Sequence, residues 1–137
     1  MTLLRDASSP IVMVDDSADD FQIVELFYAR SVLQNPLVHF ASSEVFLEYM
    51  RQVDKGSQPL PALVLMDVNM PLMSGFEVIA SVRSQETFRE VPIILMFTNS
   101  AREEDRQRAR EVGADDFFTK PWEGRGYVDL FDSFAHG

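Results

Sequence analysis

The apolar run Leu63–Met66, which Asp67 follows directly, constrains the fold of this chain more than any other stretch. Four consecutive apolar side chains leave no polar face, so they predict a strand that is buried on both sides, as strands in the middle of a parallel sheet are. Open α/β sheets bind ligands in the crevice beyond the carboxyl ends of such strands. Asp67 is therefore either a residue that ends the strand in a turn or a group that takes part in chemistry.

Strand patterns and helix patterns alternate along the chain. Ser17, Ser74 and Ser100 are each followed three residues later by an acid, which is the capping-box spacing that starts a helix. The segment 37–41 alternates in polarity and is therefore expected near the edge of the sheet. Strands are expected at 11–14, 37–41, 62–67, 91–97 and 116–119, helices at 17–33, 43–56, 74–82, 100–113 and 127–134, and a polar connector at 84–90.

This alternation predicts a parallel sheet that is covered by helices on both faces. Five strands of this length indicate an α/β fold of the flavodoxin-like, doubly wound (βα)5 sandwich type, with the sheet order 2-1-3-4-5. Residues 1–137 are expected to form a single domain, with a core at 10–135 and no output domain.

The composition excludes several classes of function. The formal net charge is −10, so the domain as a whole would repel the phosphates of a nucleic acid. No stretch reaches the ~18 apolar residues of a membrane span, and the N-terminus lacks the apolar run of a signal peptide. A cytoplasmic protein without nucleic-acid or membrane contact is expected. The absence of cysteine excludes disulfide and thiolate chemistry.

Polar residues follow the ends of the expected strands, namely Asp15 and Asp16, Asp67, Thr98 and Lys120. The crevice of a 2-1-3-4-5 sheet opens between the first and third strands, so these side chains are expected to meet there. Three carboxylates that lie close together repel one another and must be neutralised, either by protonation or by a divalent cation. Oxygen ligands of this kind suit Mg²⁺, whose coordination a phosphate oxygen often completes.

A cluster of this kind can accept a phosphoryl group. A carboxylate can attack phosphorus to give an aspartyl phosphate, and catalysis then consists mostly of positioning and charge neutralisation. Mg²⁺, the Lys120 ammonium and the Thr98 hydroxyl would each cover one phosphoryl oxygen. Asn69 lies two residues after Asp67, where its backbone carbonyl can reach the metal and its side chain can orient an attacking water.

Taken together and in this order, the motifs resemble the receiver domain of two-component response regulators. The resemblance covers about residues 10–135 and is carried by the acid pair 15–16, Met66–Pro71, Ser74–Gly75, Thr98 and Gly113–Pro121.

The resemblance implies a role for each site residue. Asp67 would accept the phosphoryl group, Asp16 would bind Mg²⁺ directly and Asp15 would bind it through a water molecule. Lys120 would pair with the phosphoryl group. Thr98 would be the switch hydroxyl, and Phe117 the aromatic residue that turns inward. It also implies a cis peptide bond between Lys120 and Pro121. The long linker before the third strand and the polar turn 98–100 are similar to stand-alone receivers that are paired with phytochrome-type kinases.

Two residues depart from the pattern of the family. Asn99 stands where a small residue is usual and is expected, together with Asn69, to modulate phosphoryl hydrolysis. Trp122 stands where a phenylalanine or a smaller apolar residue is usual, and it either fills the gap under the last helix or is an exposed docking aromatic.

Simpler interpretations remain open for several other residues. Asp19 and Asp20 are assigned to the start of a helix, where acids are favoured. His39 is assigned to an edge strand and not to a ligand set. Arg102, Arg106 and Arg110 form either a solvated, ion-paired face or a docking stripe.

The leading hypothesis is a switch that is operated by phosphorylation and is not an enzyme. A sensor histidine kinase or a phosphotransfer protein would phosphorylate Asp67, and the face formed by the fourth helix, fifth strand and fifth helix would then bind a downstream protein or a second copy of the chain. A phosphorylation-independent binding module is one alternative. An aspartyl-phosphate phosphatase is another, but it usually needs a second acid where this chain has Asn69.

Overall fold

The computed structural model describes residues 7–135. Five strands alternate with five α-helices, and one short 3₁₀ helix lies in a connector. The elements in chain order are β1 (Ile11–Val14), α1 (Ala18–Tyr28), β2 (Leu37–Phe40), α2 (Ser43–Asp54), β3 (Leu63–Met66), α3 (Gly75–Arg83), η1 (Glu86–Phe88), β4 (Ile93–Thr98), α4 (Glu103–Val112), β5 (Asp116–Thr119) and α5 (Gly124–Ser133).

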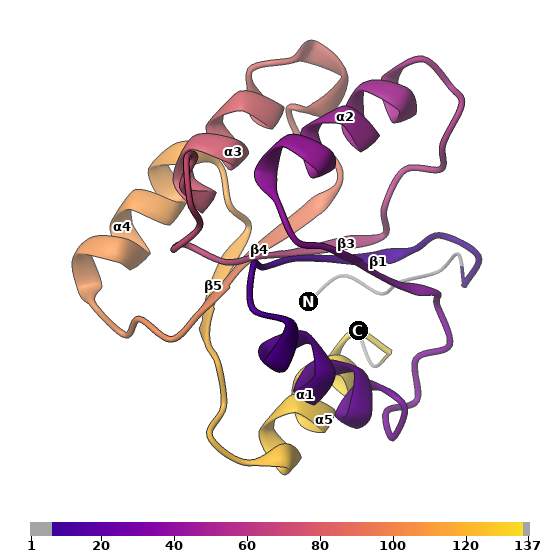
Figure 1. Cartoon of the computed structure of the whole chain (residues 1–137), viewed down its shortest axis with the longest axis vertical. Coiled ribbons are helices and arrows are strands. Elements are labelled where there is room, and N and C mark those ends of the chain that lie inside the picture. Colours follow the sequence, from indigo (N-terminus) through magenta and orange to yellow (C-terminus); the bar gives the residue numbers. More distant parts are fainter. Residues whose placement is uncertain (1–6, 136–137) are drawn as a thin grey trace.

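The strands form one parallel sheet in the order β2-β1-β3-β4-β5, which confirms the predicted fold class. β1 pairs with both β2 and β3, so the chain reverses its direction of winding beside β1. Figure 1 shows α2, α3 and α4 on one side of the sheet and α1 and α5 on the other. The crevice between β1 and β3 lies at the carboxyl edge of the sheet, where α/β sheets of this kind bind ligands.

The two layers of helices have separate cores. Strand residues alternate between the faces of the sheet, so Val12 and Val14 pack towards α2, α3 and α4, whereas Ile11 and Met13 pack towards α1 and α5. Every residue of β1 and β3 is buried, as predicted for central strands. β2 is only half-buried throughout, as predicted for an edge strand.

Three predicted helix boundaries are wrong. α5 begins at Gly124, three residues before the predicted start. α1 ends at Tyr28 and not near residue 33, because the next N–H groups, those of Arg30 and Ser31, donate to carbonyls three and not four residues back. α4 begins at Glu103 with no side-chain cap, so the predicted capping box at Ser100 is absent. The Ser100 hydroxyl instead lies 2.5 Å from the Asp105 carboxylate.

The connectors also differ from expectation at two places. The segment predicted to be polar between α3 and β4 contains η1, whose Phe88 is fully buried. The Lys120–Pro121 bond is trans, and the cis bond of the described chain is Val91–Pro92. The prediction of a cis bond between Lys120 and Pro121 is therefore wrong, and this bond has the lower-energy trans form that is usual for X–Pro.

Trp122 lies in the connection between β5 and α5, and 93% of its surface is exposed. Of the two predicted roles, the structure therefore excludes the filling of a gap under the last helix. Among the helices of residues 7–135, none has the length and hydropathy needed to cross a membrane.

Candidate functional site

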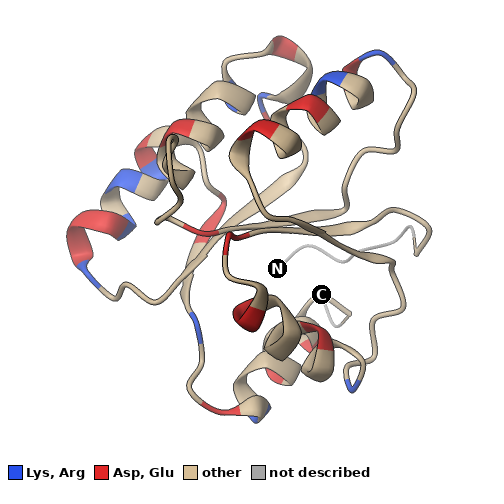
Figure 2. Cartoon of the chain, viewed as in Figure 1, with Lys and Arg blue, Asp and Glu red and all other residues tan. Residues whose placement is uncertain are grey.

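The carboxyl ends of the strands bring the predicted acids together. Asp15 and Asp16 follow β1, and Asp67 follows the neighbouring strand β3. One carboxylate oxygen from each of the three lies within 4.8 Å of the others. Figure 2 shows acidic residues gathered where β1 leads into α1. Parallel pairing explains this arrangement, since it places the ends of adjacent strands at one edge of the sheet.

Asp15 is held by contacts on every side. Its carboxylate accepts hydrogen bonds from the Ser17 backbone N–H at 2.8 Å and from the Lys120 ammonium at 2.6 Å. Nε2 of His39, on the predicted edge strand, lies 2.7 Å from the Asp15 carbonyl oxygen. Only 1% of Asp15 is exposed, so this carboxylate is fixed in place. Asp16 is exposed, and its carboxylate belongs to the same acidic cluster.

Lys120 is a buried ammonium that is surrounded by carboxylates. Its Nζ atom donates to Asp15 Oδ2 at 2.6 Å and to Asp20 Oδ2 at 2.7 Å, and it lies 4.0 Å from Asp67 Oδ1. Burial lowers the pKa of Lys120, but the hydrogen bonds to Asp15 and Asp20 and the charge of Asp67 outweigh burial and raise it overall. The side chain therefore carries its positive charge at neutral pH.

Asp67 lies at the centre of the crevice with 8% of its surface exposed. Burial is the main cause that raises the pKa of Asp67; Lys120 lowers it and the neighbouring charge of Asp15 raises it further. One carboxylate oxygen accepts a hydrogen bond from the Val68 backbone N–H at 2.9 Å. A cation bound beside Asp67 would lower this pKa and favour the ionised carboxylate.

Gly75 fixes the loop that carries Asp67. A Cβ atom at this position would collide with the backbone carbonyl oxygen of Asp67. The Gly75 N–H donates to the Val68 carbonyl at 2.9 Å, and the preceding Ser74 closes the predicted capping box with Glu77. The glycine of the Ser74–Gly75 pair is thus required for α3 to begin this close to the end of β3.

Thr98 ends β4 with its hydroxyl inside the protein. The residue is fully buried, and within residues 7–135 its Oγ1 atom makes no hydrogen bond of regular geometry. The hydroxyl still interacts with the Asp67 carboxylate, because it is one of the groups that lower the pKa of Asp67. The Thr98 backbone carbonyl accepts a hydrogen bond from the Lys120 N–H at 2.7 Å, which joins the ends of β4 and β5. Thr98 is therefore a hydroxyl donor beside Asp67.

The remaining predicted residues surround the crevice. Asn69 and Asn99 are exposed and line one groove, together with Phe76 of α3 and Arg102 at the start of α4. Phe117 is 6% exposed, and the Arg106 guanidinium of α4 lies 4.9 Å from the centre of its ring. Asn69 and Asn99 therefore flank the entrance, whereas Phe117 connects β5 to α4.

Asp20 is the residue of the crevice that the sequence analysis missed. Its capping-box spacing assigned its carboxylate to the backbone N–H of Ser17. That N–H donates to Asp15 instead, so the Asp20 carboxylate is free to pair with Lys120. The serine half of the cap is as predicted, because Ser17 Oγ accepts from the Asp20 N–H at 3.1 Å. An acid pair directly before a capping serine is the signal that could have revealed this competition.

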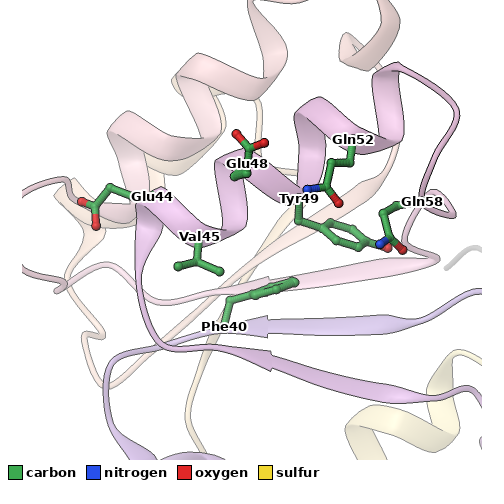
Figure 3. Close-up of a pocket in the computed structure, with 7 residues that line it drawn as sticks. All are labelled: Phe40, Glu44, Val45, Glu48, Tyr49, Gln52 and Gln58. Atoms are coloured by element: carbon green, nitrogen blue, oxygen red, sulfur yellow. The ribbon is translucent and has the colours of Figure 1, made fainter.

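A second pocket lies away from these residues, between β2 and α2. Figure 3 shows Phe40 of the edge strand at one wall and Glu44, Glu48 and Tyr49 of α2 at the other. None of the predicted site residues lines it. The crevice at the strand ends is therefore the place where the predicted acids and Lys120 come together.

The donor set of the crevice fits a divalent cation. Asp15, Asp16 and Asp67 offer only carboxylate oxygens, and hard cations such as Mg²⁺ and Mn²⁺ prefer such ligands. Two observations agree with this fit. The pKa of Asp67 is raised, and only one ammonium, that of Lys120, lies among the acids within the part of the chain that the structure describes.

Comparisons with known proteins agree with the geometry. The family model of the response regulator receiver domain matches residues 11–130. The response regulator Rcp1 of Synechocystis sp. is 26% identical over 132 residues, which cover 93% of this chain and 87% of Rcp1. The crystal structure of response regulator RPA3017, in red light signaling of R. palustris, has a TM-score of 0.83 at 26% identity and covers 93% of this chain and 92% of that one.

Longer relatives match only in part. The phosphate regulon transcriptional regulatory protein PhoB of Escherichia coli is 36% identical over 81 residues, which are 59% of this chain and 35% of PhoB. This chain therefore corresponds to about a third of PhoB's length. The sheet order, the convergent acids, the buried lysine and the family match over residues 11–130 lead to one conclusion. This chain belongs to the response regulator receiver domain family.

Proposed function

We propose that this chain is a signalling switch that accepts a phosphoryl group on Asp67 from a histidine kinase or a phosphotransfer protein. The observation that carries the proposal is the convergence of three acids and Lys120, with the buried Thr98 hydroxyl beside Asp67. A phosphoryl group on Asp67 would supply the acceptor oxygens that the ammonium and the hydroxyl are placed to meet.

Asp16, Asp67 and the backbone carbonyl of Asn69 would hold Mg²⁺, with Asp15 joined to it through water. When bound, Mg²⁺ neutralises the crowded carboxylates and the incoming phosphoryl oxygens. Family membership supports a divalent cation at this acidic cluster, and the oxygen-only ligands favour Mg²⁺ within that class.

The residues of the chain divide the transfer step between them. A carboxylate oxygen of Asp67 attacks phosphorus, the bond from phosphorus to the donor's imidazole nitrogen breaks, and the imidazole leaves with the electron pair. Lys120 and Thr98 stabilise the negative charge on the phosphoryl oxygens. The group is later lost by hydrolysis, in which water attacks phosphorus and Asp67 leaves as the carboxylate. Asn69 and Asn99, which line the neighbouring groove, are proposed to modulate this step.

Phosphorylation would be communicated to α4 and β5. If Thr98 moves towards the phosphoryl group, Phe117 turns into the space that it leaves and loses the stacking contact with Arg106 of α4. The loop after Thr98 is also tied to β5, because the Thr119 hydroxyl donates to the Ser100 carbonyl at 3.0 Å. The α4–β5–α5 face is therefore the proposed surface for a downstream protein or for a homodimer.

This proposal makes the chain a single receiver domain that works in the cytoplasm and signals through protein contacts. RPA3017 is described as a response regulator in red light signaling. A phytochrome-type histidine kinase is accordingly the proposed phosphodonor.

The test is incubation with acetyl phosphate and Mg²⁺, followed by intact mass measurement. A single phosphoryl adduct that is lost in Asp67→Asn supports the switch. Steady release of phosphate over many turnovers would instead indicate a phosphatase, and the absence of any adduct would indicate a phosphorylation-independent binding module. Removal of Mg²⁺ with EDTA should abolish the adduct.

A further inference from the structure

The Lys120 ammonium is not placed midway among the acids of the crevice. It donates to Asp15 at 2.6 Å and to Asp20 at 2.7 Å, but it stays 4.0 Å from Asp67, beyond hydrogen-bond range. Asp20 belongs to the first turn of α1, so the ion pair joins α1 to the end of β5. Two of the three N–H donors of Lys120 are thus taken up, one by Asp15 of the acidic cluster and one by Asp20 of α1.

We propose that Asp20 is a positioning residue that restrains Lys120 on the α1 side of the crevice and so weakens its interaction with a phosphoryl group on Asp67. The inference rests on the proposed function, because it concerns the same phosphoryl group. Asp20 neither touches Asp67 nor belongs to the acidic cluster that would hold the cation. It therefore acts through Lys120.

The charges of the crevice give the direction of the effect. Three carboxylates, those of Asp15, Asp20 and Asp67, lie within 4.0 Å of the Lys120 ammonium, and Asp16 adds a fourth negative charge to the acidic cluster. A phosphoryl group brings further negative charge to the site. The Asp20 charge both attracts Lys120 away from that group and repels the group itself. Its removal should therefore favour the phosphorylated state.

Burial makes the ion pair stronger than an ordinary surface pair. The Lys120 side chain is 4% exposed and the Asp20 side chain 31%, so solvent screens the pair only from one side. Asp19 provides a matched control because it lies in the same turn of α1, is exposed and carries the same charge. No contact between Asp19 and Lys120 is present in the described chain.

The experiment compares the wild-type chain with Asp20→Asn and Asp19→Asn. The rate of phosphorylation by acetyl phosphate and the affinity for beryllofluoride, both with Mg²⁺, are measured for each protein. Asp20→Asn should raise both by about three- to ten-fold, as expected for loss of a partly buried ion pair. Asp19→Asn should change both by less than about two-fold, because an exposed charge is screened.

A separate readout follows Lys120 directly in the unphosphorylated protein. Lys55 and Lys120 are the only lysines of the chain, so side-chain ¹⁵N NMR gives two ammonium signals that Lys55→Arg assigns. Asp20→Asn should shift the Lys120 signal and leave that of Lys55 unchanged, and Asp19→Asn should shift neither. A structural role of Asp20 that did not involve Lys120 would not produce this pattern.

The possible failures are distinguishable. If the wild-type chain and both variants take up neither phosphoryl group nor beryllofluoride, the proposed function itself fails. If the wild-type chain is phosphorylated but Asp20→Asn behaves like Asp19→Asn, only the restraint is overturned. A slower reaction in Asp20→Asn also overturns it, because Asp20 would then be orienting Lys120 towards the phosphoryl group.

Discussion

Asp67 and Lys120 are both buried and both have a raised pKa, but the raised pKa disfavours the charged form of Asp67 and favours that of Lys120. Burial outweighs the attraction of Lys120 and raises the pKa of Asp67, which disfavours the ionised carboxylate. For Lys120, burial is outweighed by its carboxylate partners, so the pKa of Lys120 is raised and the ammonium is favoured. A cation bound in the crevice would therefore lower the pKa of Asp67 and favour its ionised form.

Replacement of Asp67 by asparagine should stabilise the metal-free protein. A carboxyl group whose folded pKa is raised contributes stability below its unfolded pKa and loses that contribution as pH rises through the folded pKa. Asp67→Asn should therefore unfold at higher urea than the wild-type chain near about pH 7, and the difference should shrink towards about pH 4. Urea denaturation in EDTA at several pH values measures it.

Mg²⁺ and the exposed Asp19 serve as controls for this prediction. Added Mg²⁺ should stabilise the wild-type chain more than Asp67→Asn, because the proposed site would be complete only in the wild-type chain. Asp19→Asn should show no stabilisation in EDTA, since its carboxylate is exposed. A lower urea midpoint for Asp67→Asn at neutral pH would contradict the prediction.

At the scale of the element, three serines with the same spacing to an acid have three different outcomes. Ser74 and Glu77 close a full capping box at the start of α3. Ser17 caps α1, but its own N–H goes to Asp15, and Asp20 turns to Lys120. Ser100 caps nothing, because α4 begins later. Helix existence was thus predictable from spacing, whereas the partner of each polar group depended on nearby strands.

The end of α3 is joined to its neighbours by Arg83. The three nitrogens of its guanidinium each donate one hydrogen bond. Nε donates to the Gly113 carbonyl at 2.9 Å, and the two terminal nitrogens donate to the Phe88 carbonyl at 3.2 Å and the Asp115 carboxylate at 3.0 Å. Asp115 in turn accepts from the Ile94 N–H of β4 at 2.8 Å. One side chain therefore connects α3, η1, β4 and the entry to β5.

Arg83→Ala should lower the free energy of unfolding by about 2–3 kcal/mol, because it removes a largely buried guanidinium together with its three hydrogen bonds. Its side chain is only 9% exposed, although that of Asp115 is 46% exposed. The matched control is Arg51→Ala, which removes an exposed pair with Glu48 and should cost less than about 1 kcal/mol. Urea denaturation followed by circular dichroism compares the two. Equal losses would show that Arg83 contributes no more to stability than an exposed ion pair does.

At the scale of the whole molecule, burial divides the large aromatic residues into those that hold the fold and one that does not. Phe131 of α5 is fully buried against Tyr28 of α1, with their ring centres 4.9 Å apart. Trp122, which precedes the same helix, is almost fully exposed. Figure 2 shows acidic and basic residues along α4, and most of their side chains are exposed.

Trp122→Ala should therefore change the free energy of unfolding by less than about 0.5 kcal/mol. Phe131→Ala should lower it by about 3–5 kcal/mol, since it opens a cavity between α1 and α5. Trp122 is the only tryptophan, so far-UV circular dichroism and not fluorescence should follow both transitions. A loss of more than about 1 kcal/mol in Trp122→Ala would show that this indole packs against the protein.

The sequence by itself determined the order of strands and helices, the sheet order and the identity of the residues at the strand ends. These follow from apolar runs such as Leu63–Met66 and from parallel pairing, which are local and repetitive. Only the tertiary structure decided that Asp20 pairs with Lys120, that Phe88 is buried and that Trp122 is exposed. Each of these depends on which groups from distant segments compete for one donor or one space, and sequence spacing carries no record of that competition.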